Sequence, residues 1–370
     1  METSKVYFTD FRCPPGINQL EKLRKLILAA GMDKIDFKGK FVAIKIHFGE
    51  RGNLAFLRPN YAKVVADLVK ELGGKPFLTD CNTLYVGSRK HALEHLDTAY
   101  ENGFSPLSTG CHMIIADGLK GSDFAEVPVK GGKYVKNAKI GRAIMDADIV
   151  ISLNHFKGHE QTGFGGALKN LGMGSGSRAG KMEMHSDGKP RVEQDLCIGC
   201  GACAGVCAHD APQIKDGKCT IDLNKCVGCS RCIALCPADA ISPCNYGSFD
   251  ILCSKIAEYA KAVIDGRPNF HISLVRDISP YCDCHGENDV PILPDVGMFA
   301  GFDPVAVDMA CVDAVMRQKP NANGLIYDLN NEDDPDRLHA ANPNTHWQTT
   351  IEHAVEIGVG SDEYELITVK

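Results

Sequence analysis

The chain has 370 residues, of which 44% are hydrophobic and 24% are charged. This balance predicts a globular protein with enough apolar side chains for one large domain or two ordinary ones. The formal net charge of -7 and the lack of a dense basic stripe argue against a nucleic-acid-binding protein.

The N-terminal segment and the cysteine content suggest where the protein works. Residues 1–11 contain no basic segment followed by an apolar run, and no uninterrupted apolar run of about 18 residues occurs in the chain. We therefore expect a cytoplasmic protein without a membrane span. Because the cytoplasm is reducing, the 17 cysteines are expected to serve as metal ligands rather than as disulfides.

The first 155 residues alternate β-rich runs with amphipathic helical patterns. Strands are predicted at 5–11, 41–48, 76–80, 112–116 and 148–154. Helices are predicted at 20–28, 61–72 and 88–102, the last with Ser88 as its N-cap. The repeated βα unit predicts an α/β fold, in which a mostly parallel sheet is covered by helices.

Glycine is frequent between residues 158 and 180. The segment 176–182 is one residue short of a Walker motif, and 172–176 lacks the Rossmann spacing at a place where no clear helix is predicted. Two interpretations remain open. Either Lys157, Lys169 and the glycine backbone bind a small anionic ligand, or the segment is a flexible seam against the module that follows.

Two cysteine runs with the spacing C-x2-C-x2-C-x3-C come next. This duplicated pattern predicts a bacterial-type ferredoxin module of α+β structure that binds two [4Fe-4S] clusters. In such modules the fourth cysteine of each run binds the other cluster. We therefore assign one cluster to Cys197, Cys200, Cys203 and Cys236, and the other to Cys226, Cys229, Cys232 and Cys207.

Residues around these cysteines agree with cluster binding. Small residues leave room for inorganic sulfide and for N–H donors, namely Gly199, Gly201, Ala202, Gly228 and Ser230. Ala208 stands where the first run would carry proline, which loosens the turn after Cys207 without removing a ligand. Two zinc sites are the alternative, because C-x2-C pairs also suit tetrahedral zinc.

The other cysteines have no such spacing. Cys219 and Cys244 are expected to be packing residues. Buried positions of the same kind are expected for Cys13, Cys81, Cys111, Cys253 and Cys311. Among these, Cys81 is of interest because it is adjacent to Asp80.

The chain after the cysteine runs resembles a continuation of the α/β pattern. A helix is predicted at 247–264, a strand at 270–277 and a helix at 303–317. We therefore expect an α/β domain formed by 1–189 and 246–370, with the ferredoxin module inserted at 190–245. A separate C-terminal domain is the alternative.

A third site is suggested by Cys282, Cys284 and His285, which lie in a polar loop after a predicted strand. Two thiolates next to an imidazole can hold a third metal ion, or the two cysteines can form a redox dithiol. A loop with two unreactive cysteines is the third interpretation. The sequence does not choose between them.

Four further side chains are candidates for the same region. His47 and Asp80 end neighbouring predicted strands and are expected to face one crevice at the carboxyl edge of the sheet. His155 and His159 are four residues apart, but Gly158 favours a turn over a helix between them. The alternative for all four is hydrogen bonding that fixes the loops.

Several short strings connect these features to a known family. They are His47-Phe-Gly-Glu50, Asp80-Cys-Asn-Thr-Leu-Tyr85, Ala116-Asp-Gly118, His155-Phe-Lys-Gly-His159, Gly163-Phe-Gly-Gly, Lys169-Asn-Leu-Gly-Met-Gly174, Cys282-Asp-Cys284 and Asp303-Pro-Val-Ala-Val-Asp308. Over residues 5–318 the chain resembles the uncharacterised Fe-S centre proteins, domain of unknown function family 362. The resemblance implies cluster binding and an α/β host domain, and it supplies no established reaction.

The sequence therefore favours an iron-sulfur redox enzyme. Electrons would pass through two [4Fe-4S] clusters to or from a site in the α/β domain, where a small-molecule substrate reacts. The candidate catalytic residues are His47, Asp80, His155, His159, Cys282, Cys284 and His285. The alternatives are an electron carrier that docks a partner oxidoreductase, and an Fe-S or metal delivery protein.

Overall fold

A central β-sheet organises the computed structural model, which describes residues 3–84, 87–185, 189–226, 231–234, 236–238, 240–244 and 248–370. Its strands are β1 (Ser4–Asp10), β2 (Phe41–Lys45), β3 (Lys75–Asp80), β4 (His112–Ile115), β7 (Ile149–His159), β8 (Gly163–Gly165), β13 (Asn269–Val275), β14 (Gly297–Gly301) and β15 (Tyr364–Thr368). The order is β15-β1-β14-β13-β7-β2-β3-β4, with β8 paired to β7. Along this order β14 runs antiparallel to both of its neighbours, and the other adjacent pairs are parallel. The predicted mostly parallel sheet is confirmed.

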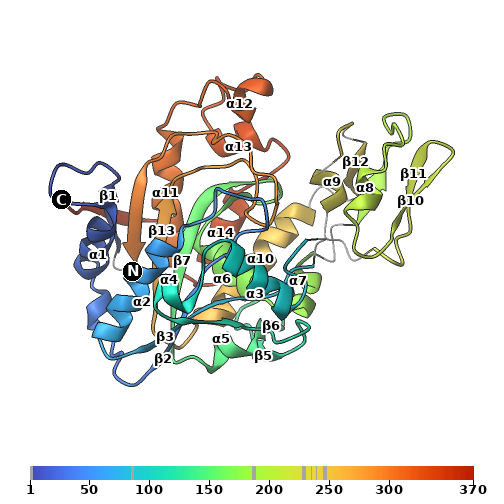
Figure 1. Cartoon of the computed structure of the whole chain (residues 1–370). Coiled ribbons are helices and arrows are strands. Elements are labelled where there is room, and N and C mark those ends of the chain that lie inside the picture. Colours follow the sequence, from blue (N-terminus) through green and yellow to red (C-terminus); the bar gives the residue numbers. More distant parts are fainter. Residues whose placement is uncertain are drawn as a thin grey trace.

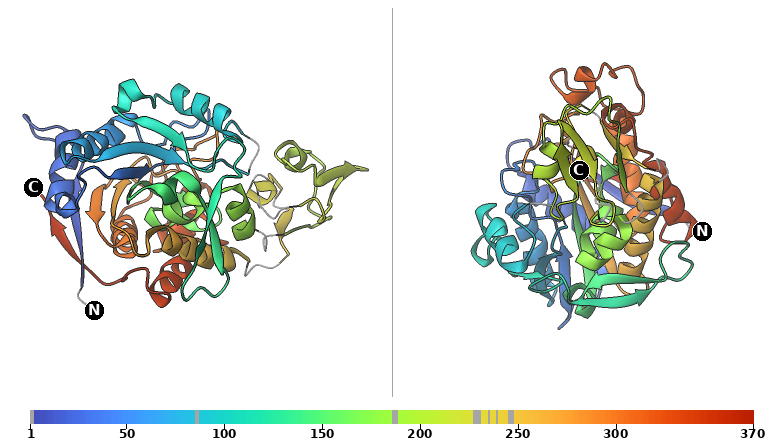
Figure 2. Two further views of the ribbon diagram at one scale, coloured as in Figure 1. Left: turned by 90° about the horizontal axis from the view of Figure 1, so that it is seen from below. Right: turned by 90° about the vertical axis from the view of Figure 1, so that its right-hand side faces the viewer.

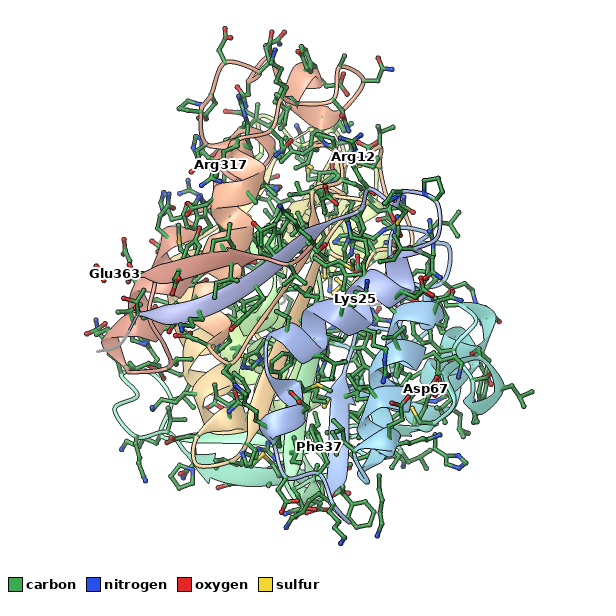
Figure 3. The ribbon with its side chains drawn as sticks, turned by 90° about the vertical axis from the view of Figure 1, so that its left-hand side faces the viewer. Arg12, Lys25, Phe37, Asp67, Arg317 and Glu363 are labelled. Carbon is green, nitrogen blue, oxygen red and sulfur yellow. The ribbon has the colours of Figure 1, made fainter. Side chains whose placement is uncertain are left out.

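Helices cover both faces of this sheet because successive strand residues point to opposite sides. Val42 and Ile44 on β2 belong to the core that includes α1 (Gln19–Ala29) and α2 (Pro59–Glu71). Figure 3 marks these two helices by Lys25 and Asp67. The opposite core includes Ala43 together with α6 (Ala167–Ser175), α10 (Ser248–Ile264), α11 (Pro304–Met316) and α14 (Gln348–Glu356).

Shorter elements connect these layers. They are the 3-10 helix η1 (Met32–Lys34), α3 (Ala92–Glu101), α4 (Pro106–Thr109), the hairpin of β5 (Phe124–Pro128) and β6 (Asn137–Gly141), α5 (Arg142–Asp146), α7 (Arg178–His185), α12 (Leu325–Asp328) and α13 (Arg337–Ala341). The sequence patterns did not predict the hairpin, β14 or β15.

Some predicted boundaries and one region without a predicted helix differ from the structure. Helix α3 begins at Ala92 with His91 as its N-cap, because the hydroxyl of the predicted cap, Ser88, contacts Glu50 instead. Strand β7 continues to His159, five residues beyond its predicted end at 154. Helix α6 forms within the glycine-rich stretch, where no clear helix was predicted.

The cysteine-rich segment forms small elements outside the main sheet. They are β9 (Pro190–Val192), α8 (Ala202–Gly205), β10 (Pro212–Lys215), β11 (Lys218–Ile221), α9 (Arg231–Ala234) and β12 (Ile241–Pro243). Two antiparallel pairs result, β10 with β11 and β9 with β12. This segment projects from the side of the α/β body (Figures 1 and 2). The chain then returns to the main sheet through α10 and β13.

Candidate functional site

The cysteine-rich segment encloses a small cavity. Its wall includes cysteines from both runs, namely Cys197, Cys200, Cys203 and Cys236. Cys203 lies on α8, and Cys236 follows α9. Gly199 has a φ of +68°, and a Cβ there would lie 2.2 Å from the carbonyl oxygen of Gly217, so only glycine fits this turn.

Backbone N–H groups point at two of these sulfur atoms. The N–H of Ala240 donates to Cys236 Sγ over 3.3 Å, and the N–H of Cys219 donates to Cys197 Sγ over 3.3 Å. Hydrogen bonds from the N–H groups of Gly199 and Cys219 hold the pKa of Cys197 below its usual value. These donors stabilise the thiolate, which is the form that binds metal.

Cys219 lies in the same cavity wall without belonging to either run. Its Sγ is 3.4 Å from Cys203 Sγ, and burial together with Cys203 raises its pKa to about 12. It therefore keeps its proton and is a packing residue, as predicted. Cys244, for which packing was also predicted, is exposed because it lies at the end of the short strand β12.

The other predicted cluster set is less defined. Cys207, Cys226 and Cys232 are half-buried, and Cys229 lies outside the described residues. The assignment of a second cluster to these four cysteines stays a prediction.

A second cavity lies at the carboxyl edge of the main sheet, and we call it the polar cavity because many of its lining side chains are polar or charged. Parallel strands place their carboxyl ends at one edge, so side chains from distant segments meet there. The space has a volume of about 80 Å³, which accommodates several water molecules or a small ligand. It is lined by the predicted candidates His47, Asp80, His155, His159, Cys282 and Cys284, and by Lys157, Lys169 and Asp283.

The length of β7 explains how three of these residues meet. In a strand, side chains two residues apart share one face, so His155, Lys157 and His159 all face the cavity. The predicted turn at Gly158 is wrong, because β8 pairs with this part of β7 and extends it. His155 Nδ1 is 2.9 Å from Asp283 Oδ1, and its Nε2 is 2.7 Å from the carbonyl oxygen of Arg276. Both ring nitrogens of His155 are thus occupied, which leaves none for a metal ion.

Cys282 is held by positive charge and by its neighbours. Lys169 Nζ on α6 lies 3.0 Å from Cys282 Sγ. A hydrogen bond from Cys284 and the charges of Lys169 and Lys157 hold the pKa of Cys282 well below its usual value, against the effect of burial. The same hydrogen bond and burial raise the pKa of Cys284. The pair is therefore a thiolate at Cys282 next to a thiol at Cys284.

His159 borders the same thiolate. Burial lowers its pKa, so the ring is neutral, and its Nδ1 accepts the N–H of Gln161 over 3.1 Å. A hydrogen bond joins its side chain to Cys282. A neutral imidazole and a lysine beside one thiolate can move a proton at that sulfur.

A residue that the sequence patterns did not single out completes the third predicted site. The side chains of Glu160, Cys284 and His285 place one potential ligand atom each within 4.8 Å of one another. Cys282 does not belong to this group, and its Sγ lies next to Lys169 Nζ instead. Glu160 directly follows the string that ends at His159, and this adjacency was the one signal for it in the sequence.

His47 and Asp80 do meet at the sheet edge, but both are fixed by buried ions. Asp80 is 2.9 Å from Lys45 Nζ and 3.7 Å from Arg89 Nη1. Burial opposes its ionisation, yet the charge of Lys45 holds the pKa of Asp80 far below its usual range. Burial and the nearby Arg89 lower the pKa of His47 to about 3. These contacts match the alternative in which the two residues fix the loops.

The fold and the site define an α/β protein with a polar, thiol-containing cavity at the carboxyl edge of a mainly parallel sheet. The chain belongs to the family described as "Domain of unknown function (DUF362)", whose model matches residues 42–313. A thylakoid-associated protein of Synechocystis sp. is 32% identical over 126 residues, which cover 32% of this chain and 33% of that protein. The chain thus matches about one third of that relative's length.

Two solved structures are similar to this chain at a low level. One is the lactate racemase apoprotein from Thermoanaerobacterium thermosaccharolyticum, with a TM-score of 0.35, 11% identity, and coverage of 74% of this chain and 51% of that chain. The other is a protein from Thermotoga maritima, with a TM-score of 0.38, 14% identity, and coverage of 79% and 57%.

None of the helices in the described part of the chain is long and apolar enough to cross a membrane.

Proposed function

We propose that this protein binds two [4Fe-4S] clusters and carries electrons to or from the polar cavity, where a small molecule is reduced or oxidised. The observation that carries the proposal is the convergence of Cys197, Cys200, Cys203 and Cys236 on one cavity. The first three belong to one run and the fourth to the other, which is the crossed pattern that a double ferredoxin requires.

The chain around this cavity suits a cluster in three ways. The glycine turn at Gly199 brings the backbone close, the N–H donors of Ala240 and Cys219 reach cysteine sulfur atoms, and Cys219 keeps its proton and leaves the ligand set to the four. A cluster bound there would supply one-electron transfer at a potential between roughly -700 and +450 mV. N–H donors to sulfur raise such a potential.

The polar cavity supplies the second half of the proposal. Its Cys282 thiolate, Lys169 and the neutral His159 can hold a small polar substrate and move a proton when an electron is transferred. The buried ions around Asp80 fix the cavity wall, so that little reorganisation is needed on binding.

An exposed apolar surface favours docking of a redox partner protein. Ile198, between Cys197 and Cys200, is 67% exposed, and Leu196 is 52% exposed. This surface belongs to the segment that projects from the α/β body (Figure 2). Exposed apolar side chains next to the cluster ligands suit a transient electron-transfer contact. The same surface would serve the alternative, a carrier that only docks a partner oxidoreductase.

Metal and sulfide analysis of protein purified without oxygen tests the proposal. We expect about eight iron atoms and about eight acid-labile sulfides per chain. Stoichiometric zinc at the cysteine runs with little sulfide would contradict it. A bound small molecule or a third metal found in the same preparation would favour the enzyme over the carrier, which needs the iron and sulfide alone.

A further inference from the structure

Three side chains outside the cysteine runs converge beside the polar cavity. Glu160 directly follows β7, whereas Cys284 and His285 lie in the loop after β13, more than a hundred residues further along the chain. Their potential ligand atoms lie within 4.8 Å of one another. Cys284 is 8% exposed and His285 is 3% exposed, so water competes little for these groups.

The two ring nitrogens of His285 face different partners. Nε2 is 3.0 Å from Glu160 Oε1, inside the group of three, and Nδ1 is 3.3 Å from Glu287 Oε1, outside it. A histidine that binds a metal usually donates its other N–H to a carboxylate, which fixes the tautomer and orients the ring. Glu287 is placed for that role, and Nε2 is then the ligand atom.

The two carboxylate oxygens of Glu160 also face different partners. Its Oε2 accepts the N–H of Cys282 over 3.2 Å, while Oε1 faces His285. One oxygen therefore orients the carboxylate, and the other is directed at the group of three. Ligating carboxylates in metal sites are held by outer hydrogen bonds of this kind.

The loop that carries Cys284 and His285 is fixed at several points. The N–H of Glu50 donates to the carbonyl oxygen of Asp283 over 2.9 Å, and Asn53 Nδ2 donates to the carbonyl oxygen of His285 over 3.0 Å. The Asp283 carboxylate is bound to His155. Because the loop is already fixed in this way, it loses little conformational entropy when a cation binds to its side chains.

We propose that Glu160, Cys284 and His285 bind a divalent transition-metal cation of the zinc type. Zinc binding would displace the proton that Cys284 carries in the absence of metal. The resulting thiolate, with an imidazole and a carboxylate, suits Zn²⁺ and excludes Mg²⁺ and Ca²⁺, which take oxygen ligands. The two anionic ligands balance the charge of the cation. Three protein ligands leave one coordination position for water or a substrate, as in catalytic zinc sites, and Cys284 places it beside the polar cavity. The site uses no residue of the cysteine runs and stands whether or not clusters bind there.

Zinc binding by the full-length protein tests this site. The protein is purified without oxygen, incubated with Zn²⁺, desalted and analysed for zinc and iron separately. We expect about one zinc per chain, and zinc K-edge X-ray absorption should show one sulfur at about 2.3 Å and nitrogen or oxygen at about 2.0 to 2.1 Å. The zinc edge is measured independently of iron, so failure of the cluster proposal would appear only in the iron and sulfide values.

Variants locate the ion. Glu160→Gln and His285→Gln should abolish stoichiometric zinc, and Glu287→Gln should weaken zinc affinity about 10- to 100-fold, as outer-shell changes do. Glu287 has an exposed side chain, so this third variant should fold even where a buried substitution does not. Cys13→Ser, which removes an exposed thiol elsewhere, should leave zinc unchanged.

Three outcomes would overturn the inference. They are no zinc retained by the wild-type chain, equal zinc in the wild type and in Glu160→Gln and Glu287→Gln, and a zinc ion surrounded by four sulfur atoms. A disulfide between Cys282 and Cys284 in the purified protein, with no zinc taken up after its reduction, would assign the pair to dithiol chemistry instead.

Discussion

The pKa and the exposure of single cysteine thiols in this chain depend mainly on the residues that surround them. Burial raises the pKa of Cys253 to about 12, and Cys81, which drew attention because of Asp80, is 1% exposed and donates to the carbonyl oxygen of Ser175 over 3.3 Å. These two are buried, unreactive thiols. Cys13 was predicted to be buried as well, but it is exposed because it follows the end of β1 in a loop. Reactivity therefore depends on the neighbours of each sulfur.

The pairing of cysteines between the two runs gives a prediction at this scale. In Cys236→Ala we expect the iron content to fall from about eight to about four per chain, because the cluster held by Cys197, Cys200 and Cys203 loses its fourth ligand. EPR of the reduced protein should then keep only the signal of the other cluster.

The matched control is Cys219→Ser, because this thiol lies in the same cavity wall and keeps its proton. It should retain about eight irons. If Cys236→Ala removed the cluster of Cys226, Cys229 and Cys232 and left the first one intact, the crossed assignment would be wrong.

Helix α6 contributes side chains to the wall of the polar cavity. It carries Lys169, which holds the Cys282 thiolate, and Asn170, whose Oδ1 accepts from Lys45 Nζ over 2.7 Å. A Cβ at Gly172 would lie 2.2 Å from the carbonyl oxygen of Ile256, so glycine there allows α6 to approach α10 closely. Residues 167–175 of the glycine-rich stretch therefore form a packed helix, which differs from the flexible seam that was one of the two interpretations of the sequence.

The first turn of α6 is held by a residue from α11. Asp308 accepts the N–H of Ala167 over 2.6 Å and the N–H of Leu168 over 2.8 Å, and it is fully buried. In Asp308→Ala both amides lose their partner, so the free energy of unfolding should fall by about 2 to 4 kcal/mol in urea denaturation. The displacement of α6 should also move Lys169 away from Cys282.

Asp308→Asn is the control for this prediction. Burial raises the pKa of Asp308 to about 7, so below that pH the neutral amide resembles the native side chain and keeps one acceptor. Asn should lose less stability than Ala. Equal stability of the wild type and Asp308→Ala would show that the two amides find other partners.

The whole molecule buries several histidines in neutral form. Burial lowers the pKa of His47, His185 and His271 to about 3. In the unfolded chain each would titrate near ~6.5. Between about pH 6.5 and 3 the unfolded state therefore binds more protons than the folded state, and stability is lost as the pH falls through this range.

Acid should thus destabilise the protein, and one histidine can be tested by itself. His271 lies between Ser152 Oγ at 2.9 Å and Asn269 Oδ1 at 2.8 Å, on β13 and away from both cavities. Between pH 7.0 and 5.5 we expect His271→Gln to lose about 1 kcal/mol less stability than the wild type, because it gains no proton on unfolding. Urea midpoints at the two pH values measure this difference. The control is His112→Gln, at an exposed position on β4, which should lose as much stability between the two pH values as the wild type does. If His271→Gln also lost as much stability as the wild type, burial would not control the protonation of His271.

Local patterns in the sequence were enough for the βα order, the mostly parallel sheet and the clustering of His47, Asp80 and Cys282 at its carboxyl edge, because strand periodicity and parallel topology follow from neighbouring residues. The spacing of the cysteine runs likewise predicts two clusters, and this stays a prediction. Tertiary contacts decided the rest. Pairing with β8 extended β7 to His159, buried ions fixed Asp80, and loop closure brought Glu160 to Cys284 and His285. These three features could not be predicted from local sequence patterns, because each depends on contacts between different segments of the chain.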